Sequence, residues 1–165
     1  MSICKSLGIP YHLWRNGRPQ IDYFSDNELL FRRFYVPGTV KDFVNNAQYS
    51  ISIFDIKDDS YNRESLCKSA EDVLYDSNGT HYANYGILAL RVGTIHGFSF
   101  VYKSDKGMHN TQLITNHRPE ECNYAHCELW FFNDGERIVE NKPKSAKKIW
   151  RRKLLSFMTV IKTAA

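Results

Sequence analysis

The sequence predicts an α+β fold with a mainly antiparallel sheet, a short middle helix and a basic amphipathic helix at the C-terminus. Its 165 residues are enough for a single domain, 1–165, with a core of its own. Ten Tyr, ten Phe and 42% apolar residues exclude a disordered chain and favour a substantial sheet. The clearest helical periodicity is in the C-terminal segment.

Turn residues and short apolar runs predict the first elements. Residues 1–27 contain Pro and Gly at intervals and are expected to form an irregular N-terminal arm. Residues 28–36 predict a strand, although so short a run also fits a helix. A second strand is expected at 49–54, followed by a charged loop at 55–63. Apolar residues at helical spacing predict a short amphipathic helix over 65–75.

The second half of the chain predicts further strands. Runs at 85–92 and 97–102 are close together and predict an antiparallel pair. Residues 103–126 are expected to form a long polar loop. The apolar run 127–132 predicts a strand, and the Asn-Asp-Gly turn after it predicts that 137–140 returns as its hairpin partner.

Residues 141–165 are predicted to form the basic C-terminal helix. Trp150, Leu154 and Phe157 recur at helical spacing and are expected to dock it on the domain. The segment has eight Lys or Arg and no acid, so its charge of +8 within an overall +4 leaves −4 on residues 1–140. Cations on its other face are expected to bind nucleic-acid phosphates by releasing counterions. These are Lys144, Lys147, Lys148, Arg151 and Arg152.

The chain is expected to be cytoplasmic and not to enter a membrane. Its first residues include one Lys and no sustained apolar run, which does not fit a secretory signal. No stretch approaches the roughly 18 apolar residues of a membrane-spanning helix. The four cysteines are therefore expected to be free thiols, as in a reducing cytosol. They are Cys4, Cys67, Cys122 and Cys127.

Reactive side chains are concentrated in residues 116–132, where a polar turn runs into a strand. His126 and Glu128 are two residues apart and are expected to share a face of that strand. A His beside a carboxylate can act as general acid or base near neutral pH. One alternative is that His126 is a turn residue and Glu128 a solvent-facing residue. Another is zinc, but the spacing of its ligands matches no familiar module, so no metal site is predicted. The four ligands would be His117, Cys122, His126 and Cys127.

Three arginines are further site candidates. Arg32 and Arg33 are neighbours in a predicted apolar strand, so strict alternation would point one of them inward. Arg63 follows Ser60 in a polar segment. An inward guanidinium is often part of a structural ion pair. The functional alternative is a clamp for an anion or phosphate, which guanidinium binds with two parallel hydrogen bonds.

Three segments resemble, in their order, the Arg–Ser–Glu order of mono-ADP-ribosyltransferase folds. They are 30–33 (LFRR) on an early strand, 60–63 (SYNR), and 126–128 (HCE) on a late strand. The chain has no Ser-Thr-Ser run, and His-x-Glu stands where that family has Glu-x-Glu or Gln-x-Glu. The chain also resembles small uncharacterised bacterial proteins that carry a serine–asparagine–arginine element and an Asn-x-Ala-His turn. That resemblance implies no activity.

The transferase resemblance implies NAD as cofactor and a role for each matching residue. Arg32 or Arg33 would position the dinucleotide phosphates, Ser60 would support the nicotinamide half, and Glu128 would stabilise the ribosyl cation.

The residues favour a small cytoplasmic protein that binds or acts on nucleic acid, such as a toxin or defence-type effector. It would use His126, Glu128 and the cationic helix. One alternative is an NAD-dependent enzyme like the ADP-ribosyltransferases. The other is an interaction module whose basic helix docks an acidic protein. Whether the chain is an enzyme is left open, and no resident cofactor is predicted for a protein that binds or acts on nucleic acid.

Overall fold

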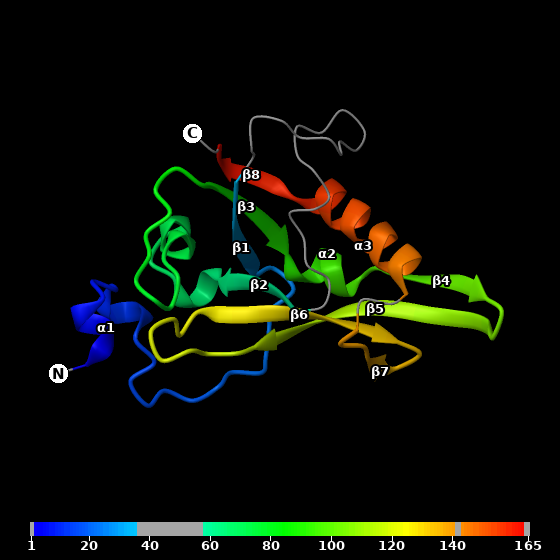
Figure 1. Cartoon of the computed structure of the whole chain (residues 1–165), viewed down its shortest axis with the longest axis horizontal. Coiled ribbons are helices and arrows are strands. Elements are labelled where there is room, and N and C mark those ends of the chain that lie inside the picture. The colour runs from blue at the N-terminus through cyan, green and yellow to red at the C-terminus, as the bar shows by residue number, and fades with distance from the viewer. Residues whose placement is uncertain (1, 36–57, 141–142, 164–165) are drawn as a thin grey trace.

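The computed structural model describes residues 2–35, 58–140 and 143–163. Within them, strands form a mainly antiparallel eight-stranded sheet in the order β4-β5-β6-β2-β1-β3-β8, with β7 paired to β6, and the α+β prediction is confirmed (Figure 1). The strands are β1 (Leu29–Phe34), β2 (Asp58–Arg63), β3 (Gly86–Arg91), β4 (Ser99–Ser104), β5 (Gly107–His117), β6 (His126–Asn133), β7 (Glu136–Arg137) and β8 (Thr159–Lys162). The helices are α1 (Ile3–Ser6), η1 (Tyr11–Leu13), η3 (Glu64–Leu66), η4 (Ala70–Leu74), α2 (Val92–His96) and α3 (Lys144–Phe157).

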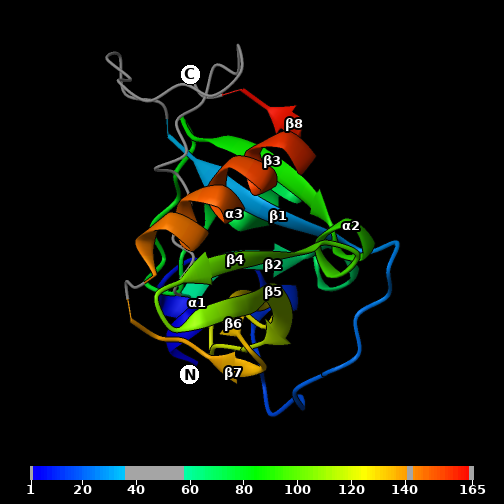
Figure 2. The same cartoon turned by 90° about the vertical axis from the view of Figure 1, so that its right-hand side faces the viewer.

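Helix α3 lies along one face of the sheet (Figures 1 and 2). Trp150 is fully buried against Phe98 and Phe100, and its indole N–H donates to Thr111 Oγ1 at 3.1 Å. The docking expected for this helix is therefore confirmed. The helix is shorter than the predicted 141–165 because the chain becomes extended after Phe157 and pairs with β3 as β8. No helix in the described part of the chain is long and apolar enough to span a bilayer.

Side chains alternate between the two faces of β6, as the apolar pattern predicts. Cys127, Leu129 and Phe131 are buried in the core cluster that includes Trp150. His126 is on the other face and is half-buried. The residues of β6 that carry candidate chemistry are therefore directed away from α3.

Several expected loops and pairs are wrong, because polar residues form strands here. The charged segment 55–63 contains β2, whose Asp59 and Arg63 are buried in ion pairs and so leave no apolar signal. The polar loop expected at 103–126 contains β5, where buried residues alternate with half-buried ones from Thr111 to His117. The strand expected at 49–54 lies outside the described residues.

The expected pairing of 85–92 with 97–102 is also wrong. Strand β3 pairs with β1 and β8, whereas β4 pairs with β5, because α2 turns the chain between them. Backbone hydrogen bonds from the Val92 N–H to the Glu28 carbonyl and from the Gly93 N–H to the Asp26 carbonyl stabilise that turn. The single helix expected over 65–75 is two short 3₁₀ segments, η3 and η4.

The N-terminal arm is mostly irregular, as expected, and packs at one end of the sheet (Figure 1). A disulfide joins Cys4 to Cys122, whose Cα atoms are 5.3 Å apart, so free thiols were the wrong expectation for this pair. Cys67 and Cys127 are free. Disulfides persist mainly in oxidising compartments. The cytoplasmic location stays a prediction, and the redox state of this pair in cells would test it.

Reducing this disulfide is expected to lower the free energy of unfolding by about 2–4 kcal/mol, because it closes a loop across 118 residues of sequence. Chemical denaturation of the wild type with and without reductant measures the change. Cys4→Ser should reproduce it, and Cys67→Ser is the matched control. An unchanged midpoint in reductant would show that the bond adds no stability.

Candidate functional site

A cavity of about 430 Å³ lies where β1 and β2 separate. These strands are in register only at two positions, Leu30 with Arg63 and Phe31 with Asn62, and beyond them the gap between the strands is lined by side chains. We call this the central cavity. Its polar walls include Arg32, Arg33, Ser60, Asn62, Asn123 and His126.

Four of the predicted site residues therefore converge on this cavity from three strands. Arg32 and Arg33 come from β1, Ser60 from β2 and His126 from β6. In the pairing of β2 with β6, Ser60 lies opposite Glu128. Glu128 is two residues from His126 on β6, so the two side chains are on the same face of the strand. Residues far apart in sequence meet here because β6 and β1 are both neighbours of β2.

The two arginines are held differently. Arg32 forms an ion pair with Asp59 at 2.8 Å and donates to the Ser60 carbonyl at 2.9 Å. Arg33 donates through Nη1 alone, to the carbonyls of Val73 at 3.0 Å and Tyr75 at 3.5 Å. Its Nε and Nη2 donate no hydrogen bond to any residue in the described part of the chain. Arg33 is thus oriented by the protein and retains donors for an anion.

His126 is oriented towards Ser60. Its Nδ1 lies 2.7 Å from the Arg118 carbonyl and 3.3 Å from a Glu120 carboxylate oxygen. A carbonyl can only accept, so this contact assigns the proton to Nδ1 and leaves Nε2 as the acceptor. The hydroxyl of Ser60 lies 3.3 Å from Nε2. A base whose other nitrogen is fixed and which faces a hydroxyl can take a proton from it or from a bound ligand.

Glu128 lies beside the central cavity rather than in its wall. It lines a neighbouring cavity of about 390 Å³ together with His126 and Glu120, which belong to both. Its carboxylate accepts from the Trp130 indole at 3.0 Å and lies 3.8 Å from Arg118. The carboxylate that contacts His126 is that of Glu120, a turn residue with no signal in the sequence.

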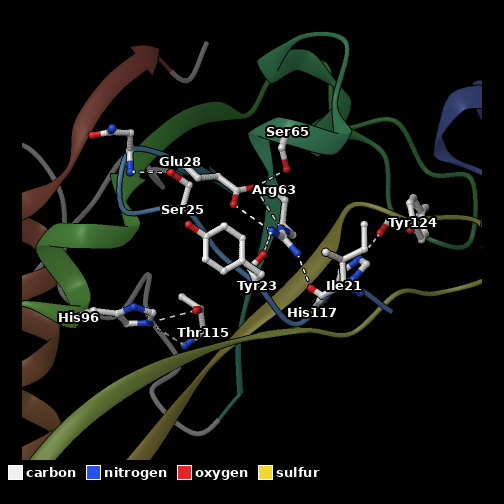
Figure 3. A network of polar contacts seen from close by, with 11 residues as sticks. Ile21, Tyr23, Ser25, Glu28, Arg63, Ser65, His96, Thr115, His117 and Tyr124 are labelled. Carbon is white, nitrogen blue, oxygen red and sulfur yellow. Dashed lines mark hydrogen bonds and ion pairs between the residues drawn. The ribbon is translucent and has the colours of Figure 1, made fainter. Parts of the chain in front are cut away.

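Arg63 lies outside both cavities, in a buried polar network (Figure 3). Its Nε and Nη2 each donate to Glu28 at 3.0 Å, and its Nη groups also donate to the carbonyls of Ile21 and Tyr23 at 2.6 Å. Burial favours a neutral Glu28, but the bonds from Arg63 and Ser65 outweigh it and hold the pKa of this carboxyl below its usual value. This environment corresponds to the structural ion pair rather than the anion clamp.

The zinc alternative finds no support in the same region. Cys122 is in the disulfide, and His117 accepts from the Ile21 N–H at 2.8 Å and donates to the Tyr124 carbonyl at 2.7 Å. Burial lowers the pKa of His117, which keeps it neutral. Across the described ranges, no three His, Cys, Asp or Glu side chains are grouped as a metal site requires.

The cationic helix presents fewer charges than expected. The prediction that Lys147 lies on the face of the helix opposite the docking face is wrong, because Lys147 is buried and donates to the Glu140 carbonyl. Arg151 is half-buried. Three exposed cations four residues apart form one ridge along α3, which we call the α3 ridge: Lys144, Lys148 and Arg152. The ridge and His126 lie on opposite sides of the sheet.

No protein-family model, curated protein or solved structure gives a significant match to this chain.

Proposed function

We propose that the central cavity binds a phosphate-bearing nucleotide and that His126 performs acid–base chemistry on it. The observation that carries the proposal is the convergence of Arg32, Arg33, Ser60 and His126 on one cavity. Arg33 supplies oriented donors for a phosphate, and the Ser60–His126 pair supplies a proton acceptor beside it. The nucleotide comes either free, as in NAD, or from a nucleic-acid strand.

The size of the site supports a ligand of this kind. A volume of about 430 Å³ is in the range of small-molecule pockets. The neighbouring cavity, which shares His126 and Glu120, adds room for a second unit of a dinucleotide or a strand. His126 would then lie at the junction of the two units.

The charged side chains of the central cavity favour the binding of a single phosphate group rather than of several phosphates at once. Asp76 and Glu120 line the cavity with the arginines, so its net charge is small. Burial opposes the ionisation of Asp76, but hydrogen bonds from the Thr80 and Asn78 backbone and from Tyr82 hold its pKa below the usual value. The selection of a ligand by this cavity would therefore depend on directed hydrogen bonds more than on the charge of the ligand.

Arg33→Gln is expected to weaken nucleotide binding about 10- to 100-fold, because charge-assisted hydrogen bonds contribute roughly 1.5–3 kcal/mol. Calorimetric titration with NAD, ADP-ribose and a short single-stranded RNA measures the effect and separates the two sources of nucleotide. Lys103→Gln, an exposed change on β4, is the control. Equal affinities of wild type and Arg33→Gln, or no binding of any probe, would overturn the proposal.

We also propose that the α3 ridge binds nucleic acid non-specifically. Its three exposed cations lie on one line of a helix without acids, which suits a phosphate backbone. The ridge is separated from His126 by the sheet, so this contact would be independent of the central cavity.

Replacing the three ridge cations by Gln is expected to reduce the slope of log affinity against log salt by about 2–3, close to one per lost phosphate contact. Filter binding from low to moderate salt measures the slope. The matched control replaces three exposed lysines away from α3, namely Lys68, Lys103 and Lys106. An unchanged slope contradicts the proposal. Loss of binding to polyglutamate without loss of nucleic acid would favour an acidic protein partner.

A further inference from the structure

Two asparagines in the wall of the central cavity are buried but incompletely hydrogen-bonded. Asn62 is 2% exposed and Asn123 is 7% exposed. The side-chain nitrogen Nδ2 of Asn123 donates to the side-chain oxygen Oδ1 of Asn62 at 2.8 Å. The remaining groups, Nδ2 of Asn62 and Oδ1 of Asn123, have no hydrogen-bond partner among the described residues. One amide NH2 group and one amide oxygen are thus left unused.

Unsatisfied buried amides are unusual, since a buried polar group without a partner has lost its hydrogen bonds to water and gained none in return. Exchanging N and O in both amides gives the same result, one free donor and one free acceptor. The Cys67 sulfur is within hydrogen-bonding range of the Asn62 side chain, and burial raises the pKa of this thiol to about 12. A neutral thiol is a weak acceptor, so it does not replace an oxygen or nitrogen partner.

Both asparagines are rigidly placed. Asn62 is in β2, in register with His126 of β6. Asn123 is in a turn closed by two backbone bonds with Glu120. The adjacent Cys122 is held by its disulfide to Cys4. The two residues that carry the unused groups are therefore held at fixed positions in the cavity wall, as expected of a binding site built before its ligand arrives.

We infer that the Asn62–Asn123 pair binds the hydrogen-bonding edge of a nucleobase or carboxamide. Every common base has a donor and an acceptor side by side on its pairing edge, separated by one carbon atom, and so has the carboxamide of nicotinamide. That pattern complements one free N–H and one free carbonyl. The inference rests on the proposed nucleotide function: Arg33 holds the phosphate, and the asparagine pair recognises the base or amide of the same ligand.

The first test compares ligands on the wild-type protein. Calorimetry should show that the best of the four common nucleoside 5′-monophosphates or nicotinamide mononucleotide binds at least tenfold tighter than ribose 5-phosphate, which lacks the base. If ribose 5-phosphate binds as tightly as all five, the inference is overturned while the phosphate site stands. If none of the six binds, the proposed function fails as well.

The second test separates hydrogen bonding from stacking. Asn62→Asp keeps the acceptor that Asn123 uses and replaces the free donor by a carboxylate oxygen, so the preference over ribose 5-phosphate should fall towards one. The ratio cancels the effect of the added charge on the phosphate. Asn110→Asp, an exposed change on β5, should leave the ratio unchanged. A tenfold preference that survives in folded Asn62→Asp would overturn the assignment to this pair.

Discussion

Glu28→Ala is expected to lower the free energy of unfolding by about 3–5 kcal/mol, the usual effect of removing one partner from a buried ion pair. Arg63 is only 3% exposed, and Glu28 is the carboxylate that contacts its guanidinium (Figure 3). The variant would leave a buried charge without its counter-ion. Urea denaturation followed by fluorescence measures the loss.

Two variants give this prediction its controls. Glu64→Ala changes an exposed acid next to Arg63 and should alter stability by no more than about 0.5 kcal/mol. The double variant Glu28→Leu with Arg63→Met removes both charges and should be less unstable than Glu28→Ala alone. A double variant at least as unstable as the single one would mean that packing, not charge, dominates.

The pH dependence of stability follows from the lowered pKa of Glu28. A carboxyl whose folded pKa is below its unfolded value stabilises the fold above the unfolded pKa, near 4.3. That contribution is lost as the pH falls through the folded pKa. Wild type should therefore lose more stability than Glu28→Gln on acidification from about pH 5. Parallel pH curves for the two proteins would contradict this account.

The elements that could be predicted are those with a local apolar pattern. β6 alternates between faces, and α3 repeats its apolar residues at helical spacing, so each could be recognised without knowing its neighbours. β2 could not be recognised in this way, because its buried residues include the charged Asp59 and Arg63. Their burial depends on ion-pair partners, which lie on β1 for Asp59 and just before β1 for Arg63. Burial of charge depends on distant residues that local hydropathy does not report.

The residues of the site could be predicted from the sequence, but the position at which they meet could not. Arg32, Arg33, Ser60 and His126 stand out by chemical type, yet their meeting depends on β2 lying between β1 and β6. The sequence-based choice of Glu128 as the carboxylate beside His126 followed strand spacing. The structure instead places Glu120 there, through the turn before β6. Contacts made by turns depend on tertiary packing, so spacing along one strand could not reveal this one.

His126→Ala is expected to reduce kcat/KM about 10²- to 10⁴-fold in the reaction that the central cavity supports, the usual contribution of a positioned acid or base. NAD turnover and RNA cleavage are the two reactions to assay. The melting temperature should change little, because His126 is half-buried at the edge of a cavity. Ser60→Ala should also lower the rate if the hydroxyl takes part in proton transfer.

His109 provides an unusually close control. Its Nε2 lies 2.6 Å from Ser104 Oγ and its Nδ1 2.7 Å from Asp134, so it has the same kinds of partner as His126. It lies on the β4–β5 hairpin and lines neither cavity described above. If catalysis needs the cavity and not only a Ser–His contact, His109→Ala should keep full activity. Loss of activity in His109→Ala with retention in His126→Ala would move the active site to the hairpin and refute the role of the central cavity.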